Sequence, residues 1–159
     1  APESIDLFTR HHVFTETEIH SRYEILLENY CKTLHIEALT LIDMVKKGII
    51  PACITYQYEL MQLLASKKAF GGFESTLEEH LVSKLSKLSS SLIKKLEVLE
   101  NILLETKTQS DSLSLARFYR DKVFVSMSEL RLIVDELETV VAKKYWPYPT
   151  YAEILYSVN

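Results

Sequence analysis

The chain has 159 residues, of which only 3 are Gly and 4 are Pro, and its formal net charge is −4. The usual share of Gly plus Pro is roughly 12%, so this composition excludes the turn-rich β-sandwich, Rossmann and phosphate-loop classes and favours long helices with few breaks. The negative balance provides no basic field, so we expect no nucleic-acid partner.

A first long helix is predicted to begin at Thr15, because Thr15 and Glu18 have the spacing of a capping box. Residues 1–15 form a lead-in segment before it. The apolar residues that follow are spaced 3, 4 and 4 apart, an eleven-residue period that predicts nearly straight helices rather than a left-handed coiled coil. They are Leu27, Tyr30, Leu34, Ala38, Leu41, Val45, Ile49, Ala52, Tyr56, Leu60 and Leu63.

Gly48 and Pro51 interrupt this series. Lys46-Lys47-Gly48 has the chemistry of a helix C-terminus, and Pro51 lacks the N–H that would bond the carbonyl of Lys47. The unbroken apolar phase across the gap favours a kinked single helix, whereas the capping chemistry favours a stop and a reversal. Both alternatives are open at this point.

The next helix is predicted to begin at Ser75, which has a second capping-box spacing with Glu78, after the turn Gly71–Gly72. The polar stretch 106–111 predicts the following break, with Ser110 or Asp111 as the next cap. Apolar residues at 3- and 4-residue spacings fill both helices. They are Leu77, Leu81, Leu85, Leu88, Leu92, Leu96, Leu99 and Leu103, then Ala116, Tyr119, Val123, Met127, Leu130, Val134, Leu137, Val141 and Tyr145.

The tail 146–159 begins with Trp146-Pro147-Tyr148-Pro149, which ends the last helix. We expect the tail to pair as an edge strand or to lie over another element. The whole chain, 1–159, is predicted to be one all-α domain, an elongated antiparallel helical bundle with a short aromatic tail.

Metal chemistry is the first function to weigh for such a bundle. Di-metal carboxylate sites need Glu-x-x-His on two helices, and none of the five histidines has Glu three residues before it. Glu16, His20 and Glu24 share one helix face, for which a solvated stripe is the preferred interpretation over a metal or acid/base cluster. The pair His11-His12 is interpreted as surface rather than ligand.

The remaining candidates also favour structural roles. Cys31 and Cys53 lack CxxC spacing and are interpreted as small core residues in a reducing cytoplasm. The tail aromatics are interpreted as a packing seam against another domain rather than a ligand platform; they are Tyr145, Trp146, Tyr148, Tyr151 and Tyr156.

No phosphate loop or nucleophile elbow is present in the sequence. We therefore predict no catalytic, cofactor-binding or metal-binding residue, and, without a long apolar run or a signal sequence, no membrane partner.

Longer motifs carry a resemblance to a known family. The sequence of residues 13–30 is VFTETEIHSRYEILLENY, and it continues through 31–33 (CKT) to 37–40 (EALT). Later segments are 119–121 (YRD), 135–138 (DELE) and 145–151 (YWPYPTY). These segments resemble the C-terminal part of type III glutamine synthetases. The likeness runs from about residue 7 to 158 and is weak between 57 and 115. Type I enzymes are more faintly similar, through their Val-Phe-Thr-acid step and a tail like Tyr156-Ser157-Val158.

The resemblance implies a non-catalytic C-terminal helical domain of an ATP-dependent glutamate–ammonia ligase. Such enzymes use ATP and magnesium or manganese in large double-ringed oligomers, with their catalytic motifs upstream of this region. The implied role is structural, in assembly. The implied partners are the catalytic domain of the same chain and neighbouring subunits, in the cytoplasm. A stand-alone helical scaffold and an effector-binding regulatory bundle are the alternatives.

The resemblance also bears on the interruption at Gly48 and Pro51. If the tail returns to the root of the first helix, the chain needs an even number of passes. We therefore favour a reversal and four helical segments, at about 16–47, 51–70, 76–106 and 111–145, over three segments with a helix kinked at Pro51.

Overall fold

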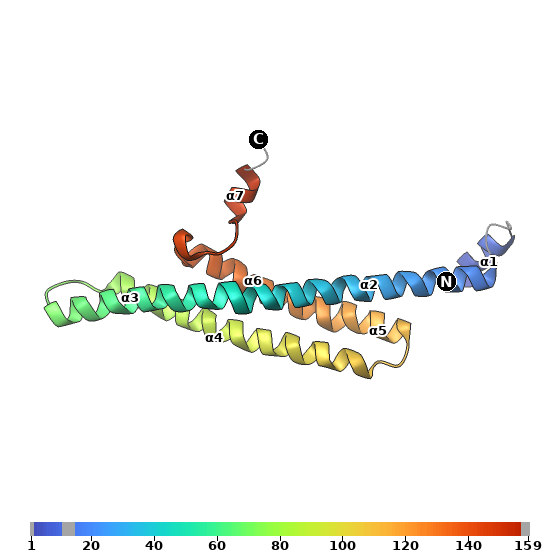
Figure 1. Ribbon diagram of the computed structural model, residues 1–159, viewed down its shortest axis with the longest axis horizontal. Coiled ribbons are helices and arrows are strands. Elements are labelled where there is room, and N and C mark those ends of the chain that lie inside the picture. The colour runs from blue at the N-terminus through green and yellow to red at the C-terminus, as the bar shows by residue number, and fades with distance from the viewer. Residues whose placement is uncertain (1, 11–14, 157–159) are drawn as a thin grey trace.

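The computed structural model describes residues 2–10 and 15–156, and their regular structure is entirely helical (Figure 1). This confirms the all-α prediction. The elements in chain order are α1 (Pro2–Arg10), α2 (Glu16–Met44), a π turn (Val45–Ile49), α3 (Ile50–Phe70), α4 (Thr76–Glu105), a 3₁₀ turn (Thr106–Thr108), α5 (Ser112–Phe118), a second π turn (Tyr119–Val123), α6 (Phe124–Val140), another 3₁₀ turn (Lys143–Tyr145) and α7 (Tyr151–Tyr156).

The bundle has three passes. The first is the unbroken helix formed by α2, the first π turn and α3; the second is α4, and the third is formed by α5, the second π turn and α6. Helix α4 packs against α3 and α6, and α5 packs against α2. Figure 1 shows the first pass as one long rod, which the other two passes cross.

The expected reversal between Lys47 and Pro51 is therefore wrong, and the three-pass alternative is correct. Val45 and Ile50 both have right-handed helical backbone angles, and the N–H of Ile50 donates to the carbonyl of Val45, five residues back. A π turn contains one residue more than an α turn, which shifts the hydrogen-bond register. Because Pro51 has no donor to offer, this shifted turn accommodates it without ending the helix.

The core follows the predicted apolar series along all three passes. The largest fully buried side chains include Val45 and Ile49 of the first pass, Leu85, Leu92, Leu96 and Leu99 of the second, and Val123, Met127, Leu130 and Leu137 of the third. Three members of the predicted series are exposed instead. Leu77 and Leu63 are 66% and 46% exposed toward the end formed by α3 and α4, and Tyr30 is 41% exposed near the opposite end.

Two of the predicted helix caps are confirmed. Thr15 and Glu18 form a full capping box, with the Glu18 N–H donating to Thr15 Oγ1 at 3.2 Å and the Thr15 N–H donating to Glu18 Oε2 at 3.0 Å. Asp111 caps α5 by accepting from the Ser114 N–H at 2.8 Å. The box predicted at Ser75 is wrong, because Ser75 has no capping hydrogen bond to the backbone.

Glu78 is diverted from that box by a lysine of the preceding helix. Lys67 Nζ lies 2.5 Å from Glu78 Oε1 and also donates to the carbonyl of Glu74 at 3.0 Å. The Glu78 side chain is only 5% exposed, and its second carboxylate oxygen has no hydrogen-bond partner. The ion pair with Lys67 lowers the pKa of Glu78 below its ordinary value. This clamp closes the turn between α3 and α4.

The clamp predicts a pH dependence of stability. A carboxyl whose pKa is lowered by folding stabilises the protein above its unfolded pKa, and that contribution is lost as the pH falls through the folded pKa. In Lys67→Met the buried carboxylate has no cation, so its pKa should rise. We expect the difference in unfolding free energy between wild type and Lys67→Met to be largest near pH 7 and to shrink below about pH 4. Urea unfolding at several pH values measures this.

Lys68→Met is the matched control, because Lys68 lies 3.5 Å from Glu79 and both side chains are largely exposed. Exposed ion pairs contribute little. A pH profile of Lys67→Met that parallels the profile of Lys68→Met would contradict the role given to the Glu78 clamp.

The tail contains no strand within residues 146–156, so of its two expected arrangements the edge strand is wrong. Thr150 and Glu153 form a capping box instead, with the Thr150 N–H donating to Glu153 Oε2 at 2.8 Å and the Glu153 N–H donating to Thr150 Oγ1 at 3.3 Å. This box starts α7, which projects away from the bundle near its middle (Figure 1). Its sequence signal, Thr-x-x-Glu, is the same signal that marks Thr15.

Candidate functional site

The returning tail is attached to the first pass at its π turn. The hydroxyl of Tyr148 donates to the carbonyl of Met44 at 3.2 Å, directly before the turn. A Cβ atom placed on Gly48 would lie 2.6 Å from the Tyr148 hydroxyl and 3.0 Å from two ring carbons. Gly48 is therefore needed for the close approach of this ring, and it does not cap a helix.

The neighbouring aromatics extend this attachment. Trp146 is 9% exposed and belongs to the core. The rings of Tyr145 and Tyr56 have their centroids 5.9 Å apart, and Lys144 Nζ lies 3.3 Å from Glu59 Oε1. The tail aromatics thus form a packing seam as predicted, but Tyr145, Trp146 and Tyr148 pack against this chain's own bundle rather than another domain. The side chains of Tyr151 and Tyr156 lie outside the described residues.

Replacing Gly48 tests this attachment. In a helix interior Ala is ordinarily more stable than Gly by about 0.5–1 kcal/mol. Here the added methyl displaces Tyr148, and overpacking costs about 1–3 kcal/mol. We expect Gly48→Ala to destabilise the wild type by about 1 kcal/mol, and to stabilise a Tyr148→Ala background by about 0.5 kcal/mol. A double-mutant cycle by urea unfolding measures both changes in unfolding free energy. Equal effects of Gly48→Ala in the two backgrounds would show that the Tyr148 ring does not pack over Gly48.

A second feature is the end of α2 that runs past the turn joining α4 and α5 (Figure 1). We call residues 16–30 the arm. Its apolar side chains are largely exposed, with Leu26 at 67%, Ile25 at 52% and Tyr23 at 49%. A helix that is apolar on a broad face is ordinarily buried against another surface. The arm therefore has the composition of a contact region.

The acidic stripe predicted on this helix lies on the surface. His20 Nε2 is 3.7 Å from Glu16 Oε1, with side chains 58% and 72% exposed, and Glu24 is exposed. Among the described residues, no group of three or more His, Cys, Asp or Glu side chains is arranged to hold a metal ion. The pair His11-His12 and the apolar residues Val13 and Phe14 lie outside the described residues.

The two cysteines are both free and buried. Burial raises the pKa of the Cys31 and Cys53 thiols above their ordinary value, which disfavours the reactive thiolate. Cys53 is 2% exposed and belongs to the core cluster, as does Cys31. Their interpretation as core residues is confirmed.

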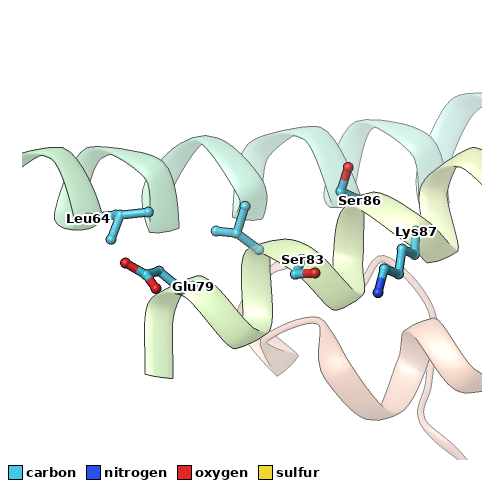
Figure 2. Close-up of a pocket in the computed structure, with 6 residues that line it drawn as sticks. Leu64, Glu79, Ser83, Ser86 and Lys87 are labelled. Carbon is cyan, nitrogen blue, oxygen red and sulfur yellow. The ribbon is translucent and has the colours of Figure 1, made fainter. Parts of the chain in front are cut away.

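Grooves lie along several helix seams, and one between α6 and the tail is lined by Asp135, Glu138, Thr139, Pro149 and Ile154. Two others lie within the bundle itself. Figure 2 shows one between α3 and α4, where Leu64 of α3 faces Glu79 at the start of α4 and Ser83, Ser86 and Lys87 follow along α4. The other lies between α2 and α5 and contains a hydrogen bond of 3.0 Å between Tyr119 Oη and His35 Nδ1.

The groove between α3 and α4 is lined by Glu79, Lys87 and two serines, but Glu79 is engaged by Ser75 and Lys68. The groove between α2 and α5 is lined by Glu28, His35 and Cys31, and burial raises the pKa of the Cys31 thiol. Among the described residues neither groove shows a nucleophile hydrogen-bonded to a base that is oriented by an acid, which is the arrangement an active site needs.

No described helix has both the length and the hydropathy needed to cross a membrane.

The chain is an elongated all-α domain whose arm leaves apolar surface uncovered and whose tail is attached to the first pass. The family profile for the glutamine synthetase C-terminal domain matches residues 1–68, which cover the lead-in segment and nearly all of the first pass. Over these residues the chain is similar to the C-terminal domain of glutamine synthetases.

Curated relatives are similar over almost the whole chain. Glutamine synthetase of Butyrivibrio fibrisolvens is 41% identical over 158 residues, which are 99% of this chain and 23% of the relative. Type-3 glutamine synthetase of Dictyostelium discoideum is 34% identical over 97% of this chain and 22% of the relative. Glutamine synthetase of Bacteroides fragilis (strain YCH46) is 27% identical over 91% and 21%. The chain thus spans less than a quarter of the length of these relatives, and the predicted resemblance to the type III class is confirmed.

Sequence reasoning missed the two π turns. The signal for the first was the spacing of Gly48 and Pro51 within an unbroken apolar phase. The second, Tyr119–Val123, has no Gly or Pro and left no signal in the sequence.

Proposed function

We propose that this chain is the structural and assembly domain of a longer glutamine synthetase. The observation that carries the proposal is that almost all of its length, 99% and 97%, aligns within glutamine synthetases more than four times longer. The exposed apolar arm supports it, because such a surface needs a covering partner. The proposed domain organisation is one helical domain, 1–159, in which the arm and the tail face the rest of the polypeptide.

The activity proposed for the longer protein is ATP-dependent ligation of ammonia to glutamate, in the cytoplasm, with ATP and magnesium or manganese. Such metals prefer clustered carboxylate oxygens. Among the described residues no group of three or more Asp, Glu, His or Cys side chains is arranged to hold a metal ion. We therefore derive no chemical step from this chain. Its lack of catalytic residues stays a prediction.

The proposed partners are the catalytic region of the same polypeptide and neighbouring subunits of a large homo-oligomer. The arm and α7 offer apolar side chains to them; Ile154 and Leu155 on α7 are 54% and 57% exposed. Contacts at two separate places on the domain would fix its orientation as well as its attachment.

The coding sequence immediately upstream tests this function. A catalytic region in the same reading frame supports the proposal, whereas a start codon directly before residue 1 favours the stand-alone scaffold and overturns it. Purified chain should catalyse no ATP-dependent formation of glutamine, and measurable ligation would contradict the assignment. In the longer polypeptide, removal of residues 1–159 should impair assembly of the oligomer, as sedimentation would detect.

An effector-binding role has one observation in its favour, the groove at His35 and Tyr119. Titration calorimetry of the chain with glutamine, ATP and Mg²⁺ tests it. We expect no heat of binding from any of these, because the groove is lined mainly by apolar atoms and has one polar pair.

A further inference from the structure

The apolar residues of the arm are arranged in a continuous stripe. Ile19, Tyr23, Leu26 and Tyr30 are spaced 4, 3 and 4 apart, which places them on one helix face. Ile25 adds apolar surface on a second face. The stripe is 41% to 67% exposed at Tyr23, Leu26 and Tyr30. Only the inner end of the arm meets the third pass, where Leu27 packs against the core and Glu28 lines the groove beside Leu115.

The net negative charge of the chain arises from the same end. Residues 1–30 carry six acidic and two basic side chains, whereas residues 31–159 carry sixteen of each, so the whole formal charge of −4 resides in the first thirty. The acidic members on the arm are Glu16, Glu18, Glu24 and Glu28, and all four are exposed. The rest of the bundle is neutral overall and presents no matching positive field.

We propose that the arm docks onto a positively charged protein surface with an apolar groove, located in the remainder of the longer polypeptide. This inference rests on the proposed function and adds the chemistry of the partner surface. A negative helix with an apolar stripe is complementary to a groove rimmed by Lys and Arg, and opposite potentials across an interface also fix its register. A second copy of the arm does not fit, because two arms of like charge repel each other.

Amide hydrogen exchange in the longer polypeptide is the direct measurement. The arm is the uncovered end of a longer helix, and a helix end with few tertiary contacts opens locally at a low free energy. The amides of residues 19–26 should therefore exchange quickly in the 159-residue chain alone. In the longer polypeptide we expect them to exchange at least about tenfold more slowly, because docking adds its free energy to local opening. Equal exchange of these amides in the two proteins would overturn docking.

Charge reversal tests the chemistry of the partner. Glu24→Lys should accelerate exchange in the docked arm at low salt, whereas Glu97→Lys, an equal change at an exposed position on α4, should leave it slow. Glu28 is left unchanged because it lines the groove between α2 and α5. Raising the salt should weaken the protection of the wild-type arm. Protection that is insensitive to salt and to the arm reversal would refute a basic partner while leaving the proposed function intact.

An apolar pair of variants separates docking from general instability. Leu26→Ser and Leu132→Ser replace leucines that are 67% and 70% exposed. Only Leu26→Ser should accelerate exchange in the arm. Sedimentation of the 159-residue chain should give a monomer, and a dimer that Leu26→Ser dissolves would show that a second copy is the occupant and would overturn the inference. A start codon directly before residue 1 would overturn both this inference and the proposed function.

Discussion

Leu92→Asp should destabilise the bundle by about 4 kcal/mol or more. Leu92 lies in the middle of α4 and is 1% exposed, among the leucines that pack between the first and third passes. An aspartate there must either bury an unpaired charge or be protonated, and the removed side chain leaves a cavity as well. Thermal and urea unfolding of the chain, followed by helical circular dichroism, measures the loss.

Ile93→Asp is the control for Leu92→Asp. Ile93 is the next residue on the same helix and is 43% exposed. Its replacement introduces the same charge with the same helix propensity, yet it should cost less than about 1 kcal/mol. If the two variants unfolded at the same urea concentration, the assignment of the leucine face to the core would be wrong.

Trp146→Ala should cost about 3–5 kcal/mol, because large aromatic side chains in a core contribute this much. Trp146 lies after the end of the third pass, in the tail, and is nevertheless 9% exposed. The expected loss means that the tail up to Tyr148 is an integral part of the bundle. Unfolding by urea, with helical circular dichroism as the signal, measures the free energy.

Trp146→Phe keeps an aromatic ring at the same position and should recover most of the stability lost in Trp146→Ala. Phe124→Ala is a second control, because Phe124 is 48% exposed on α6 and its truncation should cost about 1 kcal/mol or less. A Trp146→Ala variant as stable as Phe124→Ala would indicate that the tail is only loosely attached.

Local sequence signals predicted most of the helix starts correctly, since capping depends on residues three apart. Thr15 with Glu18 and Asp111 with Ser114 form the predicted interactions. The failure at Ser75 came from a residue distant in sequence. Lys67 of the preceding helix binds Glu78 and removes it from the capping box, and no local pattern contains that information.

The candidate site was predicted only in part. The apolar residues of the arm are visible in the sequence, because they interrupt an otherwise polar helix start. The packing of the Tyr148 ring over Gly48 was not predictable, since this contact joins residues 100 positions apart. Gly48 and Lys47 carried a C-cap signal that was misread, because a glycine needed for a close contact looks the same in sequence as a glycine that ends a helix.

The amino-acid sequence alone determined the all-α class, the three apolar seams and the resemblance to type III glutamine synthetases, because periodicity and motifs are properties of the chain itself. Only the tertiary structure decided the number of passes and the location of the tail. Whether the helix continues past Pro51 depends on a shift of one residue in the hydrogen-bond register and on the ring of Tyr148 packed over Gly48. Both depend on contacts between segments, which sequence spacing does not encode.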